Sequence, residues 1–480
     1  MSSKTLLTLQ ELAVQRLLKE EALANIALKN LPTAWLPQLL KQAYAGNHVN
    51  VLRTIVSSWP FPRLPLGALK RTSYLDTQAQ VVLEEIDKLL IQEVCPRQYK
   101  LEVLDLRSVG QNYLDMRPGS MNNWLPQTSS ETQEVAGHLK TGVKKPLKVV
   151  VDLFFMEAPL TQFLGYLLEW SDKRKGLLQL YCNELHIWSA FRFKHRKLSE
   201  KVNLEYVETL GLHDAFCNPV FLLNLASYLG CMRNLRKLSL TNIQEDNLIS
   251  LEEKSYIIIQ FTSQFLNLEC LQKLHLETVP FLEGHLHQLL GSVKTPLDDL
   301  DVTHCTLSVS EWDSLSEFPC VSQLQQLNLQ NVILTDLSPE PLRVLLVKAG
   351  PTLVTLDLED CQIEDQYLHD ILPALRSCLQ LTKFSFYGNQ ISLHALRDLL
   401  HHTASLRKLR MELYPIPQES YDNSGTLHME LMREHCDELM DILKAIREPG
   451  KVFFGTERCF DCDNRYIYNK TPLCECQHYY

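Results

Sequence analysis

Leucines recur along the second half of the chain in the pattern Leu-x-x-Leu-x-Leu, with polar or charged residues filling most of the intervening positions. Seven segments carry the pattern, and successive segments start 36, 26, 27, 29, 28 and 25 residues apart. Leucine-rich repeats have periods of about 20 to 29 residues, so this spacing predicts a leucine-rich-repeat array with one insertion, between Gln244 and Tyr256. The segments are Leu235/Leu238/Leu240, Leu271/Leu274/Leu276, Leu297/Leu300/Val302, Leu324/Leu327/Leu329, Leu353/Leu356/Leu358, Leu381/Phe384/Phe386 and Leu406/Leu409/Met411.

Between these segments the apolar residues change to helical spacing. The spacing predicts helices over Leu286 to Val293, Pro341 to Lys348, Gln366 to Arg376 and Leu393 to His402. One strand and one helix per repeat predict an α/β fold class, a leucine-rich-repeat solenoid or horseshoe with its helices on the convex side. We also expect an N-terminal helical cap and a short Cys-rich C-terminal tail.

Three repeats place a small polar residue three positions after the last apolar position of the strand. These residues are Cys305, Cys361 and Asn389. In this fold such a side chain points inward after the strand, where backbone groups of the turn need hydrogen-bond partners. We therefore expect these three side chains to satisfy turn backbone groups or to fill small spaces.

Earlier residues carry weaker versions of the same signal. Leu101/Leu104/Leu106 repeats the strand pattern, and the apolar runs Leu147 to Phe155, Leu177 to Ile187 and Val202 to Leu212 predict further strands. Residues 108–145 are rich in Ser, Thr, Gly, Asn and Pro, which predicts a loop insertion. The expected segments are a helical cap over 1–96, divergent repeats over 97–230, regular repeats over 231–445 and a C-terminal cap over 446–480.

Residues 1–96 lack the repeat. Helices are predicted over Leu6 to Leu28, Ala34 to Tyr44 and Ala79 to Gln92, while the Pro-rich run from Trp59 to Gly67 cannot be helical. A helical cap would cover the apolar edge that the first repeat otherwise exposes.

The residue between the last two core positions of each strand points to the concave face. Seven such residues form a polar row of mixed charge, which is the candidate substrate-binding face of a solenoid. The alternative is that the row is only a solvated surface. The residues are Ser239, His275, Asp301, Asn328, Asp357, Ser385 and Arg410.

Composition excludes several classes of protein. The 480 residues are 45% hydrophobic and 22% charged, which is typical of a globular chain and not of a disordered one. A net charge of −10 argues against nucleic acid as the main partner, because phosphate binding needs a basic surface. The polar N-terminus and the lack of a long apolar run predict no signal peptide and no membrane span, hence a cytoplasmic or nuclear protein.

Four of the 14 cysteines cluster near the end of the chain, as Cys459-x-x-Cys462 and Cys474-x-Cys476. Four thiolates are a tetrahedral ligand set for zinc, and His478 is a substitute ligand. Such a zinc ion would be structural, since four thiolates leave no open position for a reacting water. The alternative is four free thiols or an adventitious disulfide.

No catalytic residue stands out. The chain has no phosphate-binding Gly loop, no Gly-x-Ser-x-Gly elbow and no His-Glu-x-x-His motif. We therefore expect a non-catalytic adaptor or interaction protein.

Several separate motifs, in order along nearly the whole chain, resemble those of the PRAME family. They are Leu12-Ala13, Leu17-Leu18-Lys19, Glu21-Ala22-Leu23-Ala24, Leu31-Pro32, Trp59-Pro60-Phe61-Pro62, Leu64-Pro65-Leu66-Gly67, the segment 100–107, the segment 413–421 and the four tail cysteines. The resemblance implies a substrate receptor of a cullin-RING ubiquitin ligase that assembles with elongin B, elongin C, cullin two and a RING protein.

Two short patterns fit the boxes that such receptors carry. Leu18, Ala22 and Ile26 have the spacing of an elongin-binding box and would share one helix face, with Ala in place of the usual Cys. A cullin-selecting box fits nearby, with Pro32 expected at a helix start; its residues are Leu31, Pro32, Trp35 and Leu39. The alternative is that both boxes only pack a helical cap on the first repeats.

The family is also linked to transcriptional repression through Leu-x-x-Leu-Leu motifs, which supports a second hypothesis. Under it the chain is a non-ligase scaffold or transcriptional co-regulator that affects proliferation, differentiation and apoptosis, in germline or early-embryo settings. Five matches start at Leu36, Leu164, Leu286, Leu342 and Leu396, and we expect these leucines in the core. Exposure of Leu18, Ala22 and Ile26 would favour the ligase hypothesis.

Overall fold

The computed structural model describes residues 9–28, 30–69, 77–92, 100–107, 146–155, 162–188, 202–245, 251–459, 462 and 464–469. The chain forms two compact units. Unit 1 comprises residues 1–185 and 192–204, and unit 2 comprises residues 186–191 and 205–480. The loop insertion predicted over 108–145 lies outside the described residues.

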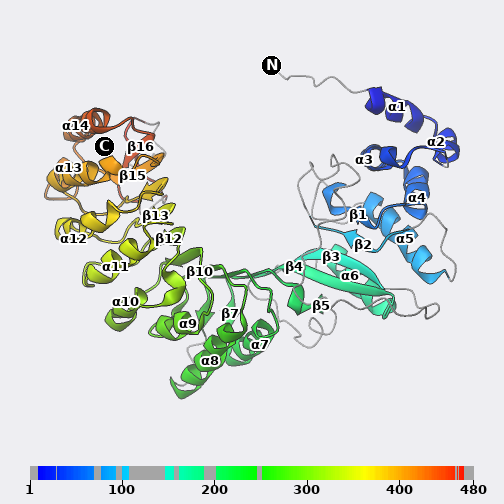
Figure 1. The fold of residues 1–480 in the computed structure, drawn as a ribbon, viewed down its shortest axis with the longest axis horizontal. Helices are drawn as coiled ribbons and strands as arrows, with labels where there is room; N and C mark the ends of the chain where they lie inside the picture. The colour runs from blue at the N-terminus through cyan, green and yellow to red at the C-terminus, as the bar shows by residue number, and fades with distance from the viewer. Residues whose placement is uncertain are drawn as a thin grey trace. The chain divides into compact units, whose positions relative to one another are not determined.

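Unit 1 begins with short helices (Figure 1). Helix α1 packs on α3, α2 packs on α4, and α4 packs on α5. Helix α4 was not predicted, although Val51, Leu52, Ile55 and Val56 have helical spacing and are fully buried. The helices are α1 (Leu9–Leu18), α2 (Glu21–Ala27), α3 (Leu36–Ala45), α4 (Val49–Ser57) and α5 (Thr77–Ile91).

The single helix predicted over Leu6 to Leu28 is divided at Lys19 and Glu20. Val14 and Leu18 of α1 are buried, as are Ala24 in α2 and Leu28 at its end. In an unbroken α-helix Ala24 would lie about 120° around the axis from Leu18. The break between the helices therefore lets both buried pairs face the core.

The strands of unit 1 lie in the order β1-β2-β3-β4, with β5 beside β4. Strand β1 runs parallel to β2, and β2 runs parallel to β3. The predicted strand over Leu147 to Phe155 is confirmed as β3, and the Pro-rich run forms β1, whose proline lies at a strand end at the edge of the sheet. The elements are β1 (Arg63–Pro65), β2 (Val103–Asp105), β3 (Leu147–Phe155), α6 (Gln162–Lys173), β4 (Leu178–Trp188) and β5 (Val202–Asn203).

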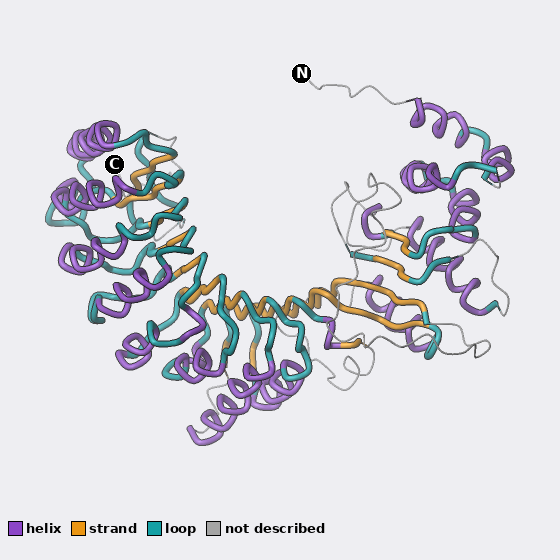
Figure 2. The backbone as a smooth tube through the Cα atoms, viewed as in Figure 1, coloured by secondary structure: helices purple, strands orange, loops and turns teal. Residues whose placement is uncertain are grey.

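Unit 2 is a solenoid of strand–helix repeats, with parallel strands along its concave side and helices along its convex side (Figures 1 and 2). The order β6-β8-β10-β11-β12-β13-β14-β15-β16 follows the sequence. The small strands β7 (Phe216–Cys217) and β9 (Gln244–Glu245) pair separately. The main strands are β6 (Thr209–His213), β8 (Lys237–Thr241), β10 (Lys273–Glu277), β11 (Asp299–Thr303), β12 (Gln326–Asn328), β13 (Thr355–Asp357), β14 (Lys383–Ser385), β15 (Met411–Pro415) and β16 (Lys451–Gly455).

The helices of unit 2 confirm the predicted repeat. All four predicted helices are present with ends within one residue of the expected ones. Helix α8 begins within the insertion predicted between Gln244 and Tyr256. The helices are α7 (Pro219–Leu229), α8 (Leu251–Ser263), α9 (Leu286–Ser292), α10 (Val309–Leu315), α11 (Glu340–Ala349), α12 (Asp365–Leu375), α13 (Leu393–His402) and α14 (Met429–Ile446).

The inward-pointing turn residues behave as predicted. The Asn389 side chain donates to the backbone oxygens of Leu358 and Phe386, at 2.8 and 2.9 Å, and accepts from the Ile363 N–H at 2.9 Å. The Cys361 thiol lies 3.1 Å from the Leu329 oxygen, and the Cys305 thiol lies 3.3 Å from the Thr303 oxygen. These side chains join each repeat to the one before it or close its own turn.

Candidate functional site

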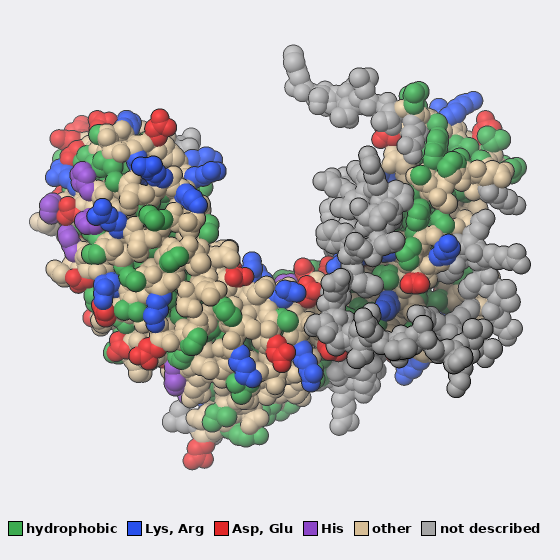
Figure 3. Space-filling view, viewed as in Figure 1, with side chains coloured by type: hydrophobic (Ala, Val, Ile, Leu, Met, Phe, Trp, Pro, Cys, Tyr) green, Lys and Arg blue, Asp and Glu red, His purple; other side chains and the backbone are tan. Residues whose placement is uncertain are grey.

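Helices α1 and α2 carry apolar residues on both of their faces. Leu9 and Leu12 are exposed on α1, and Leu23 and Ile26 are exposed on α2. Hydrophobic side chains are visible on the surface in the region of these helices in Figure 3. Because exposed apolar side chains gain free energy when a partner covers them, this region is a candidate protein-binding surface.

The structure divides the three predicted elongin-box residues. Leu18 ends α1 and is 4% exposed, whereas Ala22 and Ile26 lie on α2 and are exposed. The expectation that the three share one helix face was therefore wrong, because the helix breaks after Leu18. Ala22, Leu23 and Ile26 instead lie on the outer side of α2, and we call them the α2 surface.

Leu23 was missed because the box pattern selects every fourth residue. The available signal was that Glu21–Ala27 contains five apolar residues in seven, more than one buried helix face requires. Leu9 and Leu12 are a similar surplus on α1.

The predicted cullin-box residues differ in exposure. Pro32 is exposed and directly precedes the 3₁₀ helix Thr33–Trp35, which agrees with its expected place at a helix start. Leu31 and Trp35 are half-buried, but Leu39 is fully buried in α3. Leu31, Pro32 and Trp35 are therefore accessible to a partner, and Leu39 packs the helices of unit 1.

Six of the seven residues predicted to form the polar row align in strand register, but Ser239, Asp357 and Ser385 are buried, so the substrate-binding face stays a prediction. Strand register aligns Ser239 with His275, and then successively with Asp301, Asn328, Asp357 and Ser385. We call these six residues the concave row.

Most side chains of the concave row are paired with neighbouring repeats. His275 Nε2 lies 3.0 Å from Asp299 Oδ2, and Asn328 donates to Asp301 at 3.1 Å. Lys383 donates to Asp357 at 3.1 Å. Burial raises the pKa of both Asp301 and Asp357, while these polar neighbours oppose the rise. Hydrogen bonds and ion pairs to neighbouring side chains therefore fix most of the row.

Arg410 does not belong to the row. Ser385 aligns with Leu413, and Phe384 aligns with Glu412, so the true pattern of this repeat is Leu409-x-x-Glu412-x-Tyr414. A charged residue occupies the core position, which hid the repeat from a hydrophobic pattern. Arg410 is exposed and lies just before β15.

The tail cysteines are only partly described. Cys459 is buried, and its N–H donates to the Asn464 oxygen at 2.9 Å, while Cys462 is half-buried. Cys474 and Cys476 lie outside the described residues, and within the described residues no cluster of three or more metal-ligating side chains occurs. The structural zinc ion stays a prediction.

The Leu-x-x-Leu-Leu matches are core segments, as expected. In four of the five, the three leucines are at most 5% exposed: Leu36/Leu39/Leu40, Leu286/Leu289/Leu290, Leu342/Leu345/Leu346 and Leu396/Leu399/Leu400. In the fifth, the Leu164 side chain lies outside what the structure describes. No helix within the described ranges is both long and apolar enough to cross a membrane.

Comparison with known proteins covers nearly the whole chain. The family model of the PRAME N-terminal domain matches residues 7–114, and that of the PRAME C-terminal domain matches residues 147–477. The chain is 45% identical over 460 residues to preferentially expressed antigen in melanoma-like protein 1 of Mus musculus, covering 95% of this chain and 98% of that protein. It is 43% identical to PRAME family member 12 of Homo sapiens, covering 97% and 95%, and 43% identical to the human PRAME family member 7, covering 97% of each.

Proposed function

The chain belongs to the PRAME family, and on that premise we propose that it is the substrate-recognition component of a cullin-two RING ubiquitin ligase. In this proposal the α2 surface binds elongin B and elongin C. Leu31, Pro32 and Trp35 contact cullin two, which brings the RING protein. The concave row binds a protein substrate. Family and repeat fold support a protein-interaction role, and the ligase assembly is the step that we add.

The exposed α2 surface is the observation that carries the proposal. Leu23 and Ile26 are 53% and 68% exposed, and both lie in the box that the family resemblance assigns to elongin binding. Burying a Leu or Ile side chain contributes about 1.5–3 kcal/mol, so two of them can anchor a small helical interface. The small side chain of Ala22 leaves room between them for a partner to approach closely.

The burial of Leu18 changes which residues should make this contact. In the folded chain Leu18 and Leu39 are covered by their own unit, so they support the surface from beneath. The expected contact residues are therefore those of the α2 surface.

Binding of purified elongin B/C to the full chain tests the proposal. The variant Leu23→Asp/Ile26→Asp should weaken binding at least about 100-fold, because two charges would be desolvated at the centre of the interface. The matched control is Val347→Asp/Leu379→Asp, which changes two apolar side chains of unit 2 that are 51% and 54% exposed. The control should bind as the parent does, and both variants should melt cooperatively.

The competing function is a non-ligase scaffold or transcriptional co-regulator, in which α1–α4 only cap the repeats. The burial of Leu18 and Leu39 favours it, because two residues of the predicted boxes serve packing. The same measurement decides between the two functions. A parent chain that does not bind elongin B/C, or a Leu23→Asp/Ile26→Asp variant that binds like the parent, would overturn the ligase proposal and leave the scaffold.

A further inference from the structure

The concave face of unit 2 changes in character at its C-terminal end. In each main strand from β8 to β14, the first and third residues are polar. In β15 and β16 the positions that continue this register hold Met411, Leu413 and Phe453, with Lys451 as the polar exception. We call Met411, Leu413 and Phe453 the apolar patch. Apolar side chains therefore replace polar ones on the last two strands of the sheet.

Strand geometry places the apolar patch on the concave face. Successive side chains of a strand point to opposite faces, and the alternate residues Glu412 and Tyr414 are fully buried in the core. The three residues of the patch are only half-buried. Leu413 and Phe453 are register partners on neighbouring strands, which are about 4.8 Å apart. Because Met411 lies two residues before Leu413 on the same face, the three side chains form one continuous apolar surface.

Cations flank this surface. Lys383 and Lys451 are the register partners of Met411 on its two sides. Arg410 directly precedes Met411, and its backbone oxygen accepts a hydrogen bond from the Lys451 N–H at 2.7 Å. Lys383 donates to Asp357, whereas the side chains of Arg410 and Lys451 are exposed and form no ion pair within the part of the chain that the structure describes. These two cations can therefore pair with carboxylates of a partner.

The net charge of the chain, −10, does not prevent an anionic partner from binding here. At physiological ionic strength, interactions between exposed charges more than about 8 Å apart are largely screened, so only groups beside the patch matter. Arg410, Lys383 and Lys451 are positive, and the nearby carboxylates are Asp357, which Lys383 pairs with, and Glu448, three residues before Lys451. The cations are thus in excess beside the patch.

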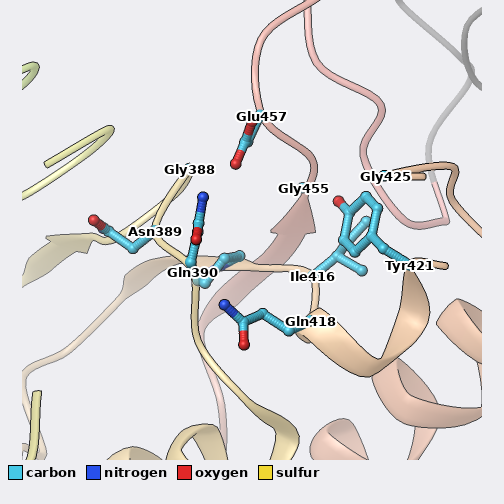
Figure 4. Close-up of a pocket in the computed structure, with 10 residues that line it drawn as sticks. Gly388, Asn389, Gln390, Ile416, Gln418, Tyr421, Gly425, Gly455 and Glu457 are labelled. Carbon is cyan, nitrogen blue, oxygen red and sulfur yellow. The ribbon is translucent and has the colours of Figure 1, made fainter. Parts of the chain in front are cut away.

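The patch ends at a pocket with a volume of about 310 Å³. Pro415 and Gly455, which lie two residues beyond Leu413 and Phe453, line this pocket, and Figure 4 shows Gly455 at the end of strand β16 beside it. The Glu457 side chain at its opening already interacts with other groups of the chain. The binding surface therefore consists of the strand residues, and the pocket marks where it ends.

We propose that the apolar patch and its flanking cations bind an extended segment of a protein partner that carries carboxylates beside aliphatic side chains. The proposal rests on the proposed function, because this segment would belong to the substrate. The aliphatic side chains would cover Leu413 and Phe453, and the carboxylates would pair with Arg410 and Lys451. Burial of apolar surface would supply affinity, and the charges would select acidic segments over basic ones.

The test uses the full chain and a fluorescein-labelled peptide, Gly-Glu-Asp-Leu-Leu-Asp-Glu-Gly, with binding followed by fluorescence anisotropy. We expect saturable binding. One peptide with lysine at the four acidic positions, and another with serine at both leucine positions, should each bind at least about tenfold more weakly. Raising the ionic strength from about 0.01 M to about 0.1 M shortens the Debye length from about 30 Å to about 10 Å and should weaken binding severalfold.

Two double substitutions locate the binding on the patch. Met411→Gln/Leu413→Asn nearly preserves the shape of both side chains and should weaken peptide binding at least about tenfold, because the apolar contact is lost. Arg410→Gln/Lys451→Gln should weaken binding by about three- to tenfold and should also remove most of the dependence on ionic strength.

Each variant has a matched control in unit 2. Val347→Gln/Leu379→Asn changes two apolar side chains that are 51% and 54% exposed and lie outside the strands. Arg376→Gln/Arg433→Gln removes two exposed charges, one directly after α12 and one on α14. Both controls should bind the peptide as the parent does. All four variants are first checked for cooperative melting.

Three results would overturn the proposal: no saturable binding by the parent, equal binding of the acidic and lysine peptides, or parent-like binding by both patch variants. An oligothymidine strand that displaces the labelled peptide as well as the unlabelled peptide does would also overturn it, in favour of nucleic acid. Elongin B/C binding by Met411→Gln/Leu413→Asn should equal that of the parent. A parent that binds the peptide but not elongin B/C would refute the ligase proposal and leave the patch as a binding surface of a scaffold.

Discussion

Helices α1 and α2 and the concave row carry opposite kinds of side chain. On the helices, Leu9, Leu12, Leu23 and Ile26 leave apolar surface in water. In the concave row the side chains are polar, and most bond to a neighbouring repeat, as Asn328 does to Asp301. The apolar side chains of α1 and α2 are therefore left in water, whereas most polar side chains of the concave row are bonded to a neighbouring repeat.

Under the proposed function, the two regions would have different binding roles. Apolar contacts are non-directional and stabilise a complex in proportion to the area buried, which suits a permanent partner. Hydrogen-bonded side chains impose direction and charge, which suits discrimination between substrates.

Strand β15 carries a charged residue at a core position, where the other repeats of the pattern have apolar residues. Glu412 is fully buried at a core position, where it accepts hydrogen bonds from Arg447 and from the Tyr414 hydroxyl, the latter at 2.7 Å. Arg447→Ala would leave a buried carboxylate without its cation, and we expect it to destabilise this repeat by about 3–5 kcal/mol. Hydrogen exchange of peptides from β15 and α14 would show the loss as faster exchange.

Arg397→Ala is the matched control for this prediction. Arg397 pairs with Glu438 at 2.5 Å, but both side chains are 39% exposed, so the loss should be about 0–1 kcal/mol. Equal exchange rates in the two variants would contradict the view that Glu412 depends on Arg447.

Glu412 also shows where the sequence stops predicting the fold. The leucine period located the strands of unit 2, and the rule for inward-pointing turn residues identified Asn389, because both follow from local geometry that every repeat shares. A charged residue in a core position is invisible to such a pattern, since its ion pair comes from Arg447, 35 residues away. The error at Arg410 followed directly.

The candidate site shows a similar limit. Helical spacing predicted that Leu18, Ala22 and Ile26 share a face, but the break at Lys19 and Glu20 depends on what α1 and α2 pack against. When a helix carries apolar residues on both faces, tertiary contacts decide which face is buried. Those contacts cannot be read from the sequence of the helix alone. The pocket near Glu457 was likewise not predictable, because three separate rim segments form it.

Unlike the paired side chains of the concave row, Asp152 of unit 1 has a buried carboxylate oxygen without a hydrogen bond. This atom is Oδ1, and burial, followed by the nearby Glu184 carboxylate, raises the pKa of Asp152 to about 7. The folded state therefore holds the proton more tightly than the unfolded state, whose pKa is about 3.9. Stability from this group is present below pH 4 and is lost as the pH rises through 7.

Asp152→Asn should remove the loss of stability that Asp152 causes as the pH rises through 7. We expect the variant to be more stable than the parent by about 1–3 kcal/mol at pH 8 and equal to it at pH 4, in denaturant melts of the full chain. Asp87→Asn should act in the opposite direction at pH 8, because the Arg174 side chain holds the pKa of Asp87 below its usual value. A constant difference between Asp152→Asn and the parent across this pH range would refute the assignment.

The smallest expected effect concerns the α2 surface itself. If Leu23 and Ile26 are exposed in order to bind a partner, truncating both should cost the isolated chain almost nothing. We expect Leu23→Ala/Ile26→Ala to change the stability of the free chain by less than about 0.5 kcal/mol, since surface substitutions rarely do more and alanine favours the helix. Val14→Ala/Leu18→Ala, which empties the buried face of α1, should cost several kilocalories per mole by comparison. A large loss in the first variant would mean that the α2 surface already packs against its own chain, and the distinction between an open apolar surface and a self-paired polar row would fail.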